Sequence, residues 1–252
     1  PFRRLLADAV TDATVTGGSA GLWIGDLNGK TVTNLRTITA LGSNGTGVHI
    51  DDGWGAIVNS GTIAATGDAI RIDQTAGMTT TVINEQGGEI RGDSDTDALG
   101  RAIGAQGGTV AGLAGTEIVE NAGAIFGDVF LGAGNDVLRN WGSGTITGRV
   151  DGGSGTDRLL IETAAGQVWP SDAVDSTGFE TVDLNATPGS TGTIRLQGPN
   201  TFAGDGGTLS SVTLHRGSLA GTGGIAGSLA VLTEGVLTPG NSIGTISVAG
   251  NY

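Results

Sequence analysis

The sequence predicts an all-β fold, a parallel β-helix in which short strands stack coil upon coil. Three observations predict it: a repeat of fixed period, a composition rich in glycine and β-formers, and apolar residues that alternate within short triplets. A repeat of about 20–50 residues is typical of solenoids, propellers and arrays. We therefore expect a rod rather than a globular domain around one pocket.

An asparagine followed by an isoleucine carries the repeat. Asn34, Asn59 and Asn84 are spaced 25 residues apart, and the pattern returns less regularly at Asn121 and Asn140. Such a coil is short for a propeller blade of about 40–45 residues, and it contains no helical stretch that could complete a βαβ unit. We expect each asparagine at an inward-facing turn, with its amide bonded to the backbone and to the asparagine of the next coil.

Alternating triplets supply further strands. We expect two strands in each coil, one running from asparagine to isoleucine and one formed by a triplet with apolar first and third residues that point inward. The triplets are 22–24, 48–50, 70–72, 129–131 and 159–161. Their outward middle positions include Trp23, His49, Arg71 and Phe130.

Composition narrows the class of protein. Glycine makes up 49 of 252 residues, against roughly 7% in average proteins. A hydrophobic content of 37% is too high for a disordered chain. The net charge of −13 makes nucleic acid a poor partner. The chain contains no cysteine, which suits export through an oxidising compartment, and no apolar run of about 18 residues that could span a membrane.

The sequence pattern divides the chain into three parts. Residues 1–12 are expected to form a lead-in, with a short amphipathic helix as one option, and residues 13–192 to form the coils. Residues 193–252 alternate most cleanly between glycine-rich turns, and we expect a β-helical or β-sandwich-like cap there. The sequence starts and stops within its own pattern, so we expect a piece of a longer protein.

The C-terminal stretch carries a family resemblance. Residues 198–204, 217–229 and 235–252, the last with the run PGNSIG, closely resemble the end of bacterial autotransporter passenger domains. The resemblance covers roughly residues 20–252. It implies type V secretion, a right-handed parallel β-helix, and an outer-membrane β-barrel of the same protein that carries the passenger outward. It also implies that residues 193–252 act like an autochaperone, emerging first and seeding the coils behind them.

This resemblance implies a location and a role. We expect the chain at the bacterial cell surface or outer membrane, or secreted after cleavage, as a stalk or adhesin. Its partners would be its own β-barrel and possible host-cell receptors, carbohydrate or further copies of itself. The alternative is a polysaccharide-processing enzyme similar to pectate lyase. Acids such as Asp51 are present, but only His49 and His215 could act as histidine bases and no catalytic motif is found. We therefore predict no enzymatic activity and no required cofactor.

A calcium module is a further alternative. Residues 152–159 match the calcium-binding β-roll pattern G-G-x-G-x-D-x-U, and residues 132–138 match it except for the first glycine. Asp136 and Asp157 lie 21 residues apart, about one coil, and could stack. Calcium needs six to eight oxygen ligands, which true β-rolls supply from tandem repeats. The other interpretation, which we favour, is that each aspartate caps backbone N–H groups at a corner.

Arg91, Gly92 and Asp93 form an RGD tripeptide of the kind that integrins bind. The interval from Asn84 to Asn121 is 37 residues rather than 25, which predicts an inserted loop of about 12 residues that could present this tripeptide. An ordinary Gly-Asp corner, which recurs elsewhere in the chain, is the alternative.

Overall fold

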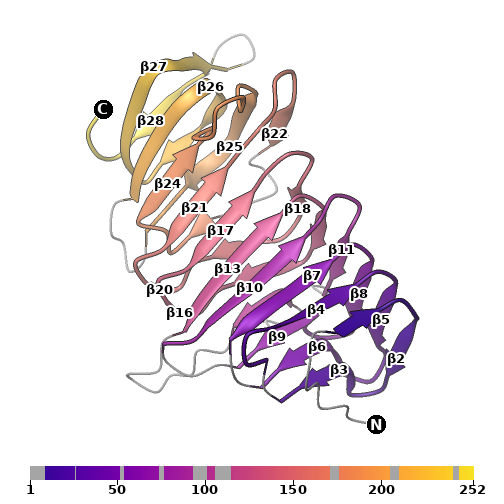
Figure 1. The fold of residues 1–252 in the computed structure, drawn as a ribbon. Helices are drawn as coiled ribbons and strands as arrows, with labels where there is room; N and C mark the ends of the chain where they lie inside the picture. Colours follow the sequence, from indigo (N-terminus) through magenta and orange to yellow (C-terminus); the bar gives the residue numbers. More distant parts are fainter. Residues whose placement is uncertain are drawn as a thin grey trace.

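The computed structural model describes residues 9–25, 27–51, 54–73, 77–92, 101–105, 115–170, 176–204, 210–240 and 244–252. In these residues the chain is all-β, and its strands pair in parallel to form a stacked β-helix (Figure 1). The described residues contain no helix that is long and apolar enough to cross a membrane.

Three stacked sheets form the sides of the coils. Sheet A runs through β1 (Ala9–Thr11), β4 (Lys30–Asn34), β7 (Gly55–Asn59), β10 (Thr79–Asn84), β13 (Thr116–Asn121), β17 (Val137–Asn140), β21 (Arg158–Ile161), β24 (Thr181–Leu184), β26 (Ser210–Ile225), β25 (Thr193–Thr201) and β22 (Val168–Pro170), with β27 (Gly227–Pro239) and β28 (Ile246–Val248) also paired to β26. Sheet B contains β2 (Val15–Gly17), β5 (Thr37–Ala40), β8 (Thr62–Ala65), β11 (Glu89–Arg91), β14 (Ala124–Phe126) and β18 (Thr145–Ile146). Sheet C contains β3 (Ala20–Ile24), β6 (Thr46–Ile50), β9 (Ile70–Ile72), β12 (Arg101–Ala105), β15 (Asp128–Phe130), β19 (Val150–Asp151) and β23 (Ser176–Thr177). A small pair, β16 (Ala133–Gly134) and β20 (Ser154–Gly155), lies at one corner.

The repeated asparagines form a buried ladder, as the sequence predicted. Each of five successive strands of sheet A ends on an asparagine that is at most 2% exposed. The side-chain amide of one donates to the side-chain oxygen of the next, from Asn34 to Asn59, Asn84, Asn121 and Asn140, at 2.7–2.8 Å. This stacking fixes the register of the corner between sheets A and B.

The ladder is closed at both ends and leaves no room for side chains beside it. Thr11 Oγ1 donates to Asn34 Oδ1 at 2.9 Å, and Asn140 Nδ2 donates to the carbonyl oxygen of Gly144 at 2.9 Å. A Cβ added at Gly88 would lie 2.5 Å from Asn84 Oδ1. The glycines of the repeat are therefore required where the backbone passes over an amide.

The expectation of two strands per coil is wrong, because the chain turns between asparagine and isoleucine. The asparagine ends a strand of sheet A. The isoleucine that follows lies on sheet B and points into the core, where Ile38, Ile63 and Ile90 stack in register. A third inward column, which the sequence analysis did not single out, lies on sheet A at Val32 and Ile57 and their successors. Each coil therefore has three sides, and the corners between them are too short to be recognised in the sequence.

Four of the five predicted triplets lie on sheet C. Val48, Ile50, Ile70 and Ile72 are at most 1% exposed, while the middle residues of these triplets point outward. The fifth triplet, 159–161, also buries its first and third residues but lies on sheet A, in register with β17. Its assignment to the triplet column was wrong, because the sheet C strands before and after it in the chain are β19 and β23.

The extra residues of the long coil do not form one inserted loop. Asn84 and Asn121 remain in register although 37 residues separate them. The connection from Ile90 to Ile103 is 13 residues long, against 7 from Ile63 to Ile70 in the coil before. The connection from Ile103 to Val119 is also lengthened, so the predicted single loop is replaced by longer connections on either side of β12.

The C-terminal end is a β-helical continuation. β26 is 16 residues long and pairs with β24 through its first half and with β25 through its second half. β27 then stacks on β26 in parallel, and the alternation predicted for residues 193–252 is confirmed by buried Ile194, Leu196, Val212 and Leu214. Residues 1–8, where a short helix had been an option, lie outside the described residues.

Candidate functional site

A group of polar side chains occupies the outer face of sheet C near the N-terminal end of the rod. Side chains two residues apart on a strand share a face, and neighbouring strands bring equivalent positions close together. Trp23, His49 and Arg71 are paired in register on β3, β6 and β9, so they form one outward row. Asp51 and Asp73 follow two residues after His49 and Arg71, and extend a second row beside the first.

His49 and Asp73 are joined directly. The Nε2 atom of His49 lies 2.9 Å from Oδ2 of Asp73, and both side chains are about one quarter exposed. Arg71 donates its Nε hydrogen to the same carboxylate, 3.0 Å from Oδ2 and 3.2 Å from Oδ1. The Trp23 ring stacks on the His49 ring with centroids 5.8 Å apart and planes inclined by 7°. The imidazole is thus fixed on one face by an aromatic ring and at one edge by a carboxylate.

The charge state of Asp73 follows from these contacts. Burial alone would raise the pKa of Asp73, because the charged form loses water. The hydrogen bond from His49 and the positive charge of Arg71 outweigh burial and hold the pKa below its ordinary value. Asp73 is therefore an ionised carboxylate at neutral pH.

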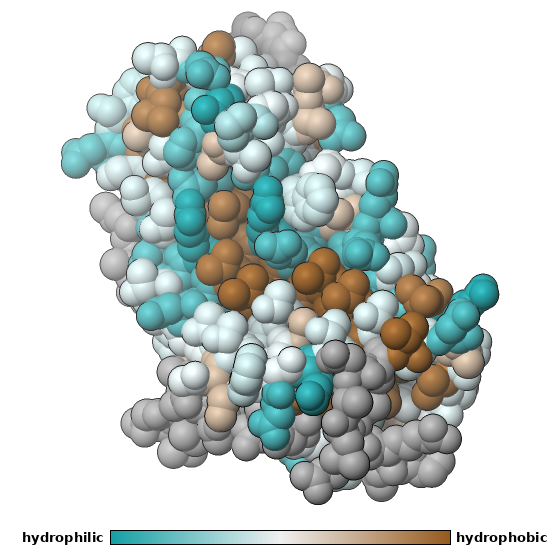
Figure 2. Space-filling model, in the orientation of Figure 1, coloured by the Kyte–Doolittle hydropathy of each residue, from teal (hydrophilic) through white to brown (hydrophobic). Residues whose placement is uncertain are grey.

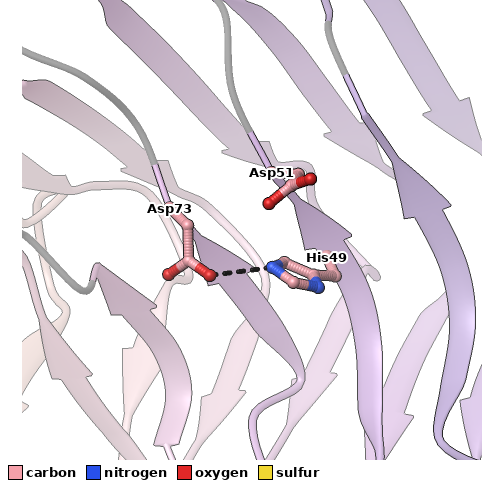
Figure 3. Close-up of side chains that lie close together, drawn as sticks. All are labelled: His49, Asp51 and Asp73. Atoms are coloured by element: carbon pink, nitrogen blue, oxygen red, sulfur yellow. Dashed lines mark hydrogen bonds and ion pairs between the residues drawn. The ribbon is translucent and has the colours of Figure 1, made fainter.

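Asp51 completes the group. Figure 3 shows Asp51 directed toward the space beside the His49–Asp73 contact. One ligand-type atom from each of His49, Asp51 and Asp73 lies within 4.8 Å of the others, and among the described residues this is the one group of three or more His, Cys, Asp or Glu side chains placed closely enough to hold a metal ion. The His49 ring is hydrogen-bonded to Asp73, and together with Asp51 these side chains offer an imidazole nitrogen and carboxylate oxygens as ligand atoms.

The sequence analysis placed His49 in an outward position but did not connect it with the aspartates. The signal was present in the residue after each triplet: V-H-I-D at 48–51 and I-R-I-D at 70–73 repeat the same spacing. Once the two triplets are placed in register, His49 lies beside Arg71, and Asp51 and Asp73 follow at equivalent positions. The repeated spacing was visible in the sequence, but the register between the two coils was not.

Asp136 and Asp157, the predicted calcium ligands, are fully buried and cap backbone groups. Oδ1 of Asp136 accepts the N–H of Glu117 at 2.7 Å, and Oδ1 of Asp157 accepts the N–H of Asp136 at 2.7 Å. The N–H of Asp157 in turn donates to Oε2 of Glu180 at 2.8 Å. These contacts form a staircase in which each acid caps the preceding coil, as the capping interpretation expected.

The glycines around these acids serve the same stacking. The carbonyl oxygen of Gly132 accepts the N–H of Ser154 at 2.8 Å, and the strands β16 and β20 pair there. Gly155 has a φ of 142°, and a Cβ at this position would overlap the carbonyl oxygen of Gly134. The G-G-x-G-x-D pattern is accounted for by close backbone approach. The calcium prediction remains a prediction, tested below.

Burial favours the protonated form of Asp136. Desolvation raises the pKa of Asp136, against the hydrogen bonds from the backbone and side chain of Glu117, which favour the carboxylate. Oδ2 of Asp136 is buried and has no hydrogen-bond partner among the described residues. The folded chain therefore holds a proton on this group more readily than the unfolded chain does.

The predicted RGD tripeptide is only partly described. Arg91 ends β11, where its Nε atom lies 3.0 Å from Oε2 of Glu89 and its guanidinium lies 3.8 Å from the centre of the Phe126 ring. The N–H of Gly92 donates to the carbonyl oxygen of Phe126 at 3.1 Å. Asp93 lies outside the described residues. Arg91 is thus held against the rod by two neighbours.

Comparison with known proteins returned no matching family model, no matching curated protein and no matching solved structure.

Proposed function

We propose that the chain is the β-helical part of an autotransporter passenger, acting as a stalk and adhesive rod at the bacterial cell surface. The observation that carries the proposal is the continuity of sheet A, which passes from β1 to β26 through successive coils. A continuous solenoid of this kind extends a chain away from its attachment point and offers a long surface for contact. The resemblance of residues 198–252 to passenger ends supports the same role.

The surface supports an adhesive role. Large apolar side chains are exposed on the outside of the coils, among them Leu41 at 66%, Trp54 at 53% and Trp141 at 41%. Figure 2 shows apolar side chains gathered in a band across the middle of one face, bordered by hydrophilic ones. Contiguous apolar patches of this kind are typical of interaction surfaces. We propose host receptors, carbohydrate or further copies of the chain as the partners.

Surface labelling tests the location. Antibodies raised against the folded chain should label intact, non-permeabilised cells of the source bacterium and should find the protein in the outer-membrane fraction or the medium. A periplasmic marker protein, detected only after permeabilisation, serves as the control. Labelling that also appears only after permeabilisation would contradict the proposal.

An attachment assay tests adhesion and the RGD tripeptide separately. If Arg91, Gly92 and Asp93 act as an integrin ligand, Asp93→Glu should abolish attachment of cultured cells to surfaces coated with the protein, without changing its circular dichroism. Equal attachment by the parent and by D93E would show that the RGD tripeptide is not required and that other parts of the protein surface mediate adhesion. No attachment by either protein would contradict the adhesive role itself.

A further inference from the structure

We propose that His49, Asp51 and Asp73 form a binding site for a divalent transition-metal ion, with Zn²⁺ as the probe. The site bridges strands β6 and β9, which belong to successive coils. It is separate from the buried acids Asp136 and Asp157, and it goes beyond the role of the rod as a stalk.

The separation of the first two ligand atoms suits one ion. Zinc lies about 2.0–2.1 Å from an imidazole nitrogen and about 2.0–2.2 Å from a carboxylate oxygen. Two such ligands at the tetrahedral angle are about 3.3–3.4 Å apart, on these bond lengths. The distance from His49 Nε2 to Asp73 Oδ2 is 2.9 Å. An ion can therefore replace the hydrogen bond between them if the two atoms separate by about half an ångström, which small side-chain rotations provide.

Asp51 supplies the third ligand. Its side chain is exposed, and its ligand atom lies within 4.8 Å of the other two. Because Asp51 is exposed, its carboxylate can rotate about the side-chain bonds toward an ion held by His49 and Asp73. Three protein ligands leave at least one position open to water or to another molecule.

The surroundings already hold two of the ligands in place. Arg71 contacts Asp73 through Oδ1 as well as Oδ2, so it can keep its contact with Oδ1 while Oδ2 binds the ion. The Trp23 ring fixes the plane of the His49 imidazole. Hydrogen bonds to a ligating carboxylate and restraint of a ligating ring are the outer contacts that metal sites use to orient their ligands.

The ligand set selects the class of ion. One imidazole nitrogen and two carboxylate oxygens suit zinc, nickel or copper, whereas calcium requires six to eight oxygens. Asp51 and Asp73 bring two negative charges against the one positive charge of Arg71. The chain as a whole carries a net charge of −13, which favours the approach of cations.

The test is a Zn²⁺ titration of the tag-free protein by isothermal calorimetry, repeated on His49→Gln, Asp73→Asn and Asp51→Asn. The matched control is His215→Gln. His215 is the other histidine of the chain and also contacts an aspartate, with Nε2 2.7 Å from Oδ1 of Asp183, but the described residues place no third metal-binding group beside it. The exposed Asp51 ensures that at least one variant leaves packing untouched.

The expected result is one Zn²⁺ per chain for the parent and for H215Q. H49Q, D73N and D51N should bind at least about tenfold more weakly, which is the lower end of the range typical for loss of an outer contact. Saturating Zn²⁺ should raise the melting temperature of the parent and of H215Q, since the ion binds only the folded arrangement. Absence of a one-to-one Zn²⁺ complex, binding unchanged in H49Q, or binding lost in H215Q would each overturn the proposal.

Discussion

The two ends of the rod hold their coils together by different means. From β4 to β17 each coil turns a corner on a buried asparagine, and the amides of successive coils bond to one another. The ladder stops after β17. Towards the C-terminal end, β26 runs for 16 residues and pairs first with β24 and then with β25, with a shift of register between Leu214 and Arg216. The first region is held in register by polar groups and the second by long strands and apolar packing.

The buried residues of the two ends also differ, with larger apolar side chains at the C-terminal end. The N-terminal coils bury single columns of isoleucine and valine on three sheets. The C-terminal end buries the two phenylalanines Phe179 and Phe202, together with leucines from β24, β25 and β26. Few charges interrupt it, since residues 193–252 contain only Arg195, Asp205, Arg216 and Glu234 besides His215. From this comparison we predict that the C-terminal end is the more stable region and that each N-terminal coil depends on a neighbour.

Deletion of residues 193–252 is expected to give the largest effect. It removes β26, which pairs with β24 through the buried residues Val212 and Leu214, and it leaves Val182 and Leu184 at an open end. We expect the remaining coils to be largely unfolded or aggregated, as measured by circular dichroism and sedimentation. Deletion of residues 1–29, which also removes an end of the stack, is the control and should leave a cooperative fold. If the truncated 1–192 chain kept the melting temperature of the parent, the proposed difference in stability between the two ends would be contradicted.

Asn84→Ala breaks the ladder in its middle. The substitution removes the donor to Asn121 Oδ1 and the acceptor of Asn59 Nδ2 in a site that is fully buried. We expect a loss of about 2–3 kcal/mol in the free energy of unfolding, the scale for buried polar groups that lose their partners. Urea denaturation measures it, and a loss below about 0.5 kcal/mol, within the ordinary range for surface substitutions, would show that the ladder is dispensable.

A double-mutant cycle tests whether the ladder acts as a unit. Asn84→Ala combined with Asn121→Ala should cost less than the two changes separately, with a coupling of about 0.5–3 kcal/mol, because the two side chains are hydrogen-bonded to each other. Asn84→Ala combined with Asn185→Ala is the control. Asn185 is buried in the C-terminal region and bonds to backbone groups at Thr163, Gly192 and Arg216. Additivity in both pairs would mean that no coupling passes along the ladder.

Much of this architecture was predictable, and the missing part has a physical reason. The spacing of Asn34, Asn59 and Asn84 indicated both the coil and the amide ladder, because identical residues at a fixed period stack on themselves. The third side of the coil was missed, since a corner of two residues, such as Ser60 and Gly61, gives no visible break between strands.

The candidate site was less predictable than the fold. His49, Arg71 and the outward character of their positions followed from alternation, but the contact with Asp73 depends on which triplet lies beside which. Register between coils is set by corners whose length varies, and sequence alternation within one coil does not report it. The buried acid staircase was anticipated as a capping interaction at Asp136 and Asp157, although not its continuation to Glu117 and Glu180.

Asp136→Asn tests the buried acid staircase through pH. The pKa of Asp136 is raised in the folded chain, so the folded state binds a proton that the unfolded state releases between the two pKa values. Stability of the parent should therefore rise as the pH falls from neutral through the raised pKa, down to the ordinary value of an aspartate. The difference in unfolding free energy between the parent and D136N, measured by urea denaturation from pH 7 to 4, should show this slope.

Asp136→Ala is the companion variant. It leaves the N–H of Glu117 without its acceptor and should cost about 1–3 kcal/mol at every pH in that range. D136N should lose less stability than D136A at pH 7, because it keeps an oxygen for that N–H. A pH-independent difference between the parent and D136N would contradict the raised pKa.

Calcium should have the smallest effect. If Asp136 and Asp157 act only as caps, millimolar calcium or a chelator should leave the melting temperature nearly unchanged. A calcium-binding pair at saturating metal would instead gain several kcal/mol by mass action, about 2.7 kcal/mol at one hundred times the dissociation constant. A clear calcium-dependent shift that Asp157→Ala abolishes would replace the capping interpretation with a metal site.

Native-state hydrogen exchange tests the contrast between the two ends most directly. In the folded chain, the amides of β26 should be the last to exchange, because this strand is 16 residues long, pairs with β24, β25, β27 and β28, and buries Val212, Leu214, Leu219 and Ile225. The amides of β4, β7 and β10 should exchange earlier, through opening events of lower free energy. Slower exchange in β4 to β10 than in β26 would contradict the account and make the asparagine ladder the more stable region of the rod.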